Sequence, residues 1–201
     1  MTVARTSWLL LVLVPALPAH LGGQEPGWTP VSTAGIARAA GRVDSVFVDK
    51  LIPTSSVGGG DWVSYLAARL GALPIPEPSG IVVAVDTAAI RVRGRVTDLP
   101  AETRALFGPM LLLLDSTTTL EAEVVIGPSG PGVVKFVLTT IRVNGYRVPE
   151  SVLEVFLAQV GHRYPELTET GRVLLVAIPP DGKVRLMPDA VVLSREEGAR
   201  P

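Results

Sequence analysis

Short segments in which apolar and polar residues alternate, separated by glycine and proline turns, constrain the fold of this chain most strongly. In residues 90–97 one face would carry Ile90, Val92, Gly94 and Val96, and the other Arg91, Arg93 and Arg95. A period of two residues is typical of a β-strand with one buried face. Alternating or Val-rich patterns predict further strands over residues 42–50, 81–86, 111–126, 133–143, 172–178, 183–187 and 190–194.

The turns between these segments predict antiparallel pairing. Residues 127–132 read Gly-Pro-Ser-Gly-Pro-Gly, a strong turn signal between two long strands. Residues 179–182, Pro-Pro-Asp-Gly, connect two later strands, and residues 87–89 could turn the chain between two earlier ones. Short turns of this kind join neighbouring strands as hairpins.

A wide apolar helix is expected over residues 149–160. Pro149 suits the first helical position, and the apolar residues that follow are Val152, Leu153, Val155, Phe156, Leu157 and Val160. Their arc is wider than a surface helix needs, so we expect burial on most sides. Shorter helices are expected over residues 61–70, after a flexible glycine segment at 58–60 and with Asp61 as N-cap, and over residues 100–107. The predicted fold is α+β: a curved antiparallel β-sheet wrapped around a long apolar helix, with one or two further short helices.

The N-terminal residues predict export. Residues 8–17 form an apolar run behind Arg5; it is shorter than the roughly 20 residues of a membrane span and fits the roughly 7–15 of a secretory signal. We assign residues 1–23 to a signal peptide, with an uncleaved anchor as the alternative, against which Pro15 and Pro18 argue. Residues 24–41 are expected to be a linker, 42–194 a single domain and 195–201 a disordered tail. The expected location is periplasmic or extracellular, with membrane tethering if the leader is kept.

The composition excludes several classes of partner and chemistry. The chain has 18 basic and 19 acidic residues and a net charge of −1, so no overall field attracts nucleic acid. It has no cysteine, which excludes disulfides and a lipid-modified cysteine at the leader. An exported domain without disulfides must rest on core packing, which is feasible at this size.

The sequence offers no recognisable catalytic constellation, so we expect no enzyme, no cofactor and no metal. His162 is the one histidine beyond the leader region, and as a base it would need an oriented nucleophile and a third group. A single histidine without cysteine excludes the common zinc patterns. Two carboxylate pairs, Glu121 with Glu123 and Glu150 with Glu154, leave open a cell-wall glycan hydrolase, although a solvated surface is the simpler interpretation.

The row Arg91, Arg93 and Arg95 is the strongest polar feature. Alternate residues of a strand project to the same side, about 6.5–7 Å apart, so three guanidinium groups in line could bind phosphate or another anion. The alternative is an outward face whose arginines pair with carboxylates of a neighbouring strand, such as Glu121 and Glu123.

Three segments carry a resemblance to a known family. Residues 61–66 read Asp-Trp-Val-Ser-Tyr-Leu, residues 90–96 read Ile-Arg-Val-Arg-Gly-Arg-Val, and residues 143–149 read Val-Asn-Gly-Tyr-Arg-Val-Pro before the apolar helix. Over residues 42–194 this order resembles small exported bacterial envelope proteins of the AsmA-like and tubular lipid-binding kind. The resemblance implies a curved antiparallel sheet around a long helix, with an apolar groove for acyl chains, and it implies lipid handling without catalysis.

We therefore expect binding or carriage of a lipid or other hydrophobic ligand in the bacterial cell envelope, with peripheral membrane contact as a further possibility. The expected ligand-lining residues are Val152, Val155, Phe156, Leu157, Phe136 and Leu138, and the expected anion-binding residues are Arg91, Arg93 and Arg95. The alternatives are an envelope protein–protein interaction module without a ligand cavity and, third, a glycan hydrolase. Strands apolar on both faces fit either a solid interior or one that admits an apolar guest.

Overall fold

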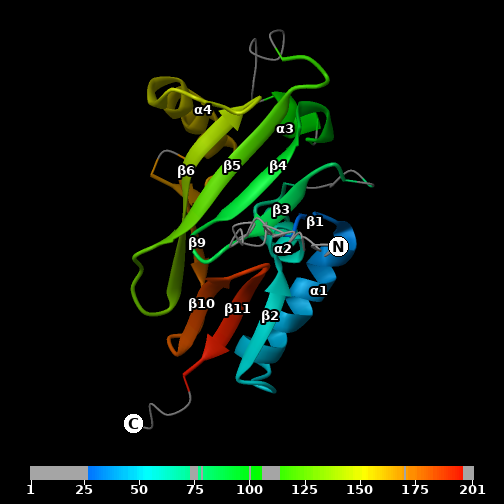
Figure 1. Cartoon of the computed structure of the whole chain (residues 1–201). Coiled ribbons are helices and arrows are strands. Elements are labelled where there is room, and N and C mark those ends of the chain that lie inside the picture. Colours follow the sequence, from blue (N-terminus) through cyan, green and yellow to red (C-terminus); the bar gives the residue numbers. More distant parts are fainter. Residues whose placement is uncertain are drawn as a thin grey trace, which may run out of the picture.

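The computed structural model describes residues 27–72, 77, 79–99, 101–105, 114–169 and 171–196. These residues form two antiparallel sheets and several short helices (Figure 1). The larger sheet has the order β1-β3-β4-β5-β6-β9-β8, with β7 also paired to β6. Its strands are β1 (Thr29–Pro30), β3 (Val82–Val85), β4 (Ile90–Arg95), β5 (Thr119–Gly127), β6 (Val133–Val143), β7 (Tyr146–Arg147), β8 (Leu167–Thr168) and β9 (Val173–Ala177).

The smaller sheet has the order β10-β11-β2. Its strands are β2 (Thr54–Gly58), β10 (Gly182–Met187) and β11 (Ala190–Arg195). Each strand pairing described in the two sheets is antiparallel, as the turn residues predict. The predicted hairpins are confirmed for β3–β4, β5–β6 and β10–β11, because alternation and turn residues agree there; the strand predicted over residues 111–126 begins only at Thr119, and residues 114–118 lie outside it.

In the described part of the chain, four α-helices accompany the sheets: α1 (Thr33–Val43), α2 (Gly59–Arg69), α3 (Ala101–Ala105) and α4 (Glu150–Arg163). A π-helical segment, η1 (Asp44–Val48), extends α1, and a 3-10 turn, η2 (Val96–Asp98), follows β4. The predicted strand over residues 42–50 is wrong. The side chain of Ser32 accepts a hydrogen bond from the backbone N–H of Gly35 at 3.0 Å and starts a helix that runs through these residues. Much of the predicted linker, residues 24–41, therefore lies in α1.

The predicted fold class is also wrong, although the antiparallel pairing and the mixture of helix and sheet are as expected. Among the described residues the longest helical stretch has 16 residues, and no long apolar helix is found. α4 has 14 residues and lies beside the upper parts of β5 and β6 rather than inside a curved sheet (Figure 1). It buries Leu153 and Leu157, whereas Val152 is 40% and Val155 63% exposed. The wide apolar arc of α4 is therefore divided between the protein interior and the surface.

The core lies where α2 packs between the two sheets. Trp62 of α2 is 1% exposed, and its ring lies 6.0 Å from that of Phe136 on β6. Residues 58–60 are not a flexible break but the end of β2 and the start of α2. A Cβ on Gly60 would lie 2.2 Å from the carbonyl oxygen of Pro30, so this position needs glycine for the close approach of helix and strand. Gly58, not Asp61, caps α2, and Asp61 forms an ion pair with Arg38 of α1 at 2.7 Å.

A β-bulge in β6 keeps one face of the larger sheet apolar along its whole length. Glu123 pairs with Thr140 and the next residue, Val124, with Leu138, so Thr139 has no partner in the register. One extra residue reverses the alternation of side chains. Phe136 before the bulge and Ile141 after it therefore face the same side, although they are an odd number of residues apart.

Candidate ligand pocket

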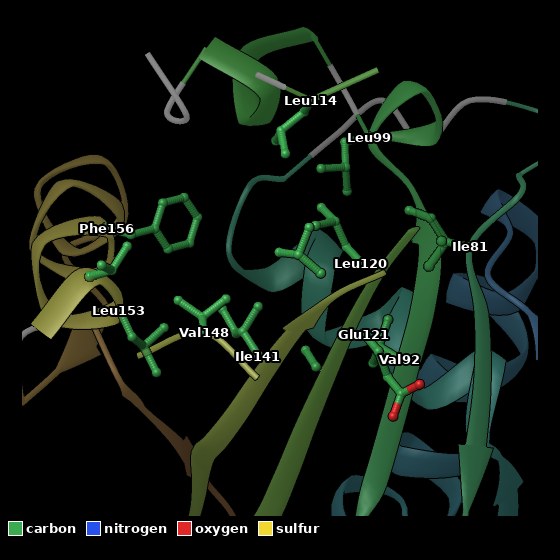
Figure 2. Close-up of a pocket in the computed structure, with 14 residues that line it drawn as sticks. Ile81, Val92, Leu99, Leu114, Leu120, Glu121, Ile141, Val148, Leu153 and Phe156 are labelled. Atoms are coloured by element: carbon green, nitrogen blue, oxygen red, sulfur yellow. The ribbon is translucent and has the colours of Figure 1, made fainter. Parts of the chain in front are cut away.

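A cavity of about 240 Å³ lies between α4 and the upper half of the larger sheet. Figure 2 shows Phe156 and Leu153 of α4 on one side, Ile81 on the other, and Leu99 and Leu114 above the strands. The remaining lining residues are Val92, Gly94, Leu120, Glu121, Ala122, Ile141, Val143, Val148 and Val152.

The strand residues that line the cavity follow from alternation and from the bulge. Val92 and Gly94 of β4 lie in register with Ala122 and Leu120 of β5, and these in turn with Ile141 and Val143 of β6. Directly opposed residues of an antiparallel pair share a face, so all six lie on one face. Glu121, the one charged lining residue, is bound by Arg142, whose Nη1 donates to its Oε1 at 2.9 Å.

The size and lining of the cavity match a small apolar ligand. Cavities of about 150 Å³ lined by Leu, Ile and Phe stay dry and bind benzene, and drug-sized ligands occupy about 300–1,000 Å³. A volume of about 240 Å³ suits a small apolar molecule or one end of a long apolar chain. The aliphatic side chains of the wall offer no hydrogen bonds, so a polar guest would lose its hydration there without compensation.

The structure brings some of the predicted lining residues to this cavity. Val152 and Phe156 line it, and Leu157 is buried in the same helix without lining it. Phe136 is 3% exposed in the core beside Trp62. Leu138 lies half-buried on β6 and Val155 faces solvent.

Sequence reasoning missed most of the cavity wall, which comes from strands. The signal was present in the alternation of Leu120 with Ala122 and of Ile141 with Val143, but the bulge that aligns both pairs on one face leaves no mark in the sequence. Leu153, which is 2% exposed and reaches the cavity, was expected only as part of the helix.

The three arginines of β4 have different surroundings. Arg91 is bound by Asp86 at 2.7 Å and lies 3.6 Å from Glu123. Arg93 stacks on the ring of Trp28, 4.1 Å from its centroid. Arg95 is exposed at the end of the strand, where its backbone N–H donates to Asp98 at 2.9 Å.

Asp86 is held by the turn that precedes β4. Its Oδ1 accepts from the backbone N–H groups of Ala88 and Ala89 at 2.7 and 2.8 Å. Desolvation raises the pKa of this carboxyl, but the two backbone hydrogen bonds and the charge of Arg91 outweigh it and hold the pKa below its ordinary value.

The carboxylates considered for glycan chemistry are mostly bound by arginines. Glu121 pairs with Arg142 and Glu123 lies near Arg91, as described above. Glu150 pairs with Arg172, and Glu154 is exposed on α4.

The predicted single histidine, His162, is exposed in the last turn of α4. Within the part of the chain that the structure describes, no group of three or more His, Asp or Glu residues lies close enough to hold a metal ion. None of the described helices is long and apolar enough to cross a membrane. The predicted leader, residues 1–23, and residues 197–201 of the predicted tail lie outside the described residues.

No protein family, no curated protein and no solved structure matches the chain.

Proposed function

We propose that this protein binds a lipid or another hydrophobic ligand in the cavity between α4 and strands β4–β6, without chemical conversion of the ligand. The observation that carries the proposal is the aliphatic wall of that cavity, to which four separate segments and α4 contribute. Transfer of apolar surface out of water is favourable by about 25 cal/mol per Å², so burial in the cavity stabilises the bound state of an apolar guest.

The position of α4 supports uptake of such a ligand. Its inner side buries Leu153 and Leu157, and Val152 both lines the cavity and is 40% exposed. One wall of the cavity thus reaches the protein surface, where a ligand can enter. The expected export of the chain, inferred from residues 8–17, would place this binding in the cell envelope.

The matched valines of α4 test the proposal. Val152 lines the cavity and Val155, three residues later, is 63% exposed and does not. We expect Val152→Trp to weaken uptake of the uncharged fluorescent probe N-phenyl-1-naphthylamine at least about tenfold, because the indole takes the volume that the probe needs. Val155→Trp, the control with the same change in volume, should leave uptake unchanged.

Native mass spectrometry of the purified protein gives a second readout, because a hydrophobic ligand acquired during expression should co-purify. A protein that is free of ligand and takes up no probe would contradict the proposal and favour the interaction module instead. Equal uptake by the wild type and Val152→Trp would place the probe elsewhere.

A further inference from the structure

A polar groove adjoins the apolar cavity. It has a volume of about 470 Å³ and is lined by Ser79, Gly80, Val82, Arg93, Gly94, Arg95, Asp98 and Thr119. Gly94 belongs to the walls of both the groove and the apolar cavity. The two spaces therefore lie on either side of a single residue that has no side chain.

The groove and the cavity share Gly94 near the end of β4, where Ile81, just before β3, lies against it: a Cβ on Gly94 would be 3.1 Å from Cγ1 of Ile81. β3 pairs with β4 as far as Val82 opposite Arg93, and beyond that pair Gly94 and Arg95 are matched only to β5. Alternation places Gly94 towards the cavity and the two arginines on the opposite face. An amphiphile that occupies both spaces would therefore run past Gly94 and Ile81, which also lines the cavity.

Two guanidinium groups dominate the charge of the groove. The guanidinium carbon of Arg93 lies over the ring of Trp28, 4.1 Å from its centroid, and an aromatic ring accepts none of the hydrogen bonds that a guanidinium group can donate to a carboxylate or phosphate. Within the described residues, Arg95 takes part in no ion pair, whereas Arg91 at the other end of the strand is bound by Asp86. The one carboxylate of the groove, Asp98, accepts the backbone N–H of Arg95.

We propose that the ligand is a single-chain amphiphile whose anionic head group, a carboxylate or a phosphate, binds Arg93 and Arg95 while its apolar tail occupies the cavity. This inference rests on the proposed function and names the class of ligand for the same site. Planar guanidinium donors match both carboxylate and phosphate oxygens. The tail alone would give affinity, and the head group would fix its orientation.

Three probes with the same alkyl chain separate the head group from the tail: dodecanoate, dodecyl phosphate and uncharged dodecanol, each titrated by displacement of N-phenyl-1-naphthylamine. Hydrogen bonds to charged groups contribute about 1.5–3 kcal/mol, so at least one anion should bind about tenfold more tightly than the alcohol. Preference for dodecanoate indicates a fatty acid, and preference for dodecyl phosphate indicates a phosphate-bearing lipid.

Arg95→Gln is the main variant, because Arg95 is exposed and takes part in no ion pair among the described residues. It should bring the affinity for the preferred anion down towards that of dodecanol and leave dodecanol itself unchanged. Arg93→Gln should act in the same direction, and Arg185→Gln, at an exposed strand position of the smaller sheet, should change neither affinity.

Equal binding of the anions and the alcohol, or loss of the alcohol together with the anion in Arg95→Gln, would overturn the head-group assignment. Binding of dodecanol that Val152→Trp abolishes would still support the cavity itself. Absence of binding by all three probes would contradict the proposed function as well.

Discussion

The two halves of the larger sheet have the same kind of apolar face, but different helices pack on them and they pack differently. In the lower half, α2 lies against the sheet and Trp62 fills the space beside Phe136. In the upper half, the face continues through Ala122 and Ile141, and between it and α4 lies a cavity of about 240 Å³. The face is continuous because of the bulge at Thr139, so the difference comes from the covering helices and not from the strands.

The covering helices differ in how closely they approach the sheet. Gly59 and Gly60 let the start of α2 come near to β3 and β1, where a Cβ on either residue would clash. α4 meets the interior mainly through Leu153, Phe156 and Leu157, and its outward positions include the exposed Val155. The close approach of α2 gives a densely packed core. α4 leaves a cavity between itself and the sheet, which a ligand could fill.

The largest expected effect concerns truncation in the two halves. Trp62→Ala removes a fully buried side chain and should lower the free energy of unfolding by about 3–5 kcal/mol. Leu120→Ala in the cavity wall should cost about 1–2 kcal/mol, because Leu120 is already half-exposed and lacks neighbours on its cavity side. Urea denaturation of the ligand-free proteins measures both values.

Trp62→Phe is the control for this comparison. The indole Nε1 has no hydrogen-bond partner among the described residues, so phenylalanine keeps an aromatic ring and removes a buried N–H group whose desolvation is costly. It should cost less than Trp62→Ala. Equal costs for Trp62→Ala and Leu120→Ala would show that the two halves are packed alike.

A smaller effect with opposite signs is expected when leucine replaces a buried alanine of the solid core and an alanine of the cavity wall. Ala39 of α1 is 0% exposed in the core, and Ala39→Leu should destabilise the protein by about 1–3 kcal/mol through overpacking. Ala122→Leu enters the cavity and should stabilise the ligand-free protein by about 0.5–2 kcal/mol, as cavity-filling changes do.

Ala122→Leu should also reduce uptake of N-phenyl-1-naphthylamine, since the added side chain takes the place of the ligand. Thermal unfolding with and without the probe measures both effects. A loss of stability in Ala122→Leu similar to that in Ala39→Leu would contradict an open cavity.

The sequence predicted the strands better than it predicted the helices that pack on them. Regular alternation and strong turns located β4, β6 and β10–β11, because strand faces and glycine or proline turns are set by neighbouring residues. Residues 42–50 were assigned to a strand from a period-two pattern. That pattern is short, and the helix capped by Ser32 outweighs it. Tertiary packing then buries Val46 and Phe47 on one side of that helix.

The candidate site could be predicted only in part for the same reason. Val152 and Phe156 were identified from helical spacing, and the arginines of β4 from alternation. The cavity itself depends on a register shift at Thr139 and on the distance of α4 from the sheet. Both are relations between segments far apart in the chain, and no local pattern reports them.

The arginines at the two ends of β4 also differ, one lying at the densely packed half of the sheet and the other at the half with the cavity. Arg91 lies at the solid end, beside the buried Ile90, and is bound by Asp86 and near Glu123. Arg95 lies at the cavity end and is exposed. The first arginine is thus held by carboxylates of the protein itself, whereas the second takes part in no ion pair among the described residues.

The smallest expected effect tests the stabilising end of the strand. Asp86→Asn keeps an oxygen acceptor for the backbone N–H groups of Ala88 and Ala89 but removes the charge that binds Arg91. Because both partners are about one-third exposed, the loss should be about 0.5–1 kcal/mol at neutral pH. Asp49→Asn, at an exposed carboxylate just after η1, is the control and should have a smaller effect.

The pH dependence of that loss has a defined sign. The pKa of Asp86 is lowered in the folded protein, so its contribution to stability is fully present above the unfolded pKa of about 3.9 and is lost as the pH falls through the folded value. The difference in free energy of unfolding between the wild type and Asp86→Asn should therefore shrink as the pH is lowered below about 4. Urea denaturation across this range measures it, and a difference that grows on acidification would show that the charge of Asp86 does not stabilise the solid end of β4.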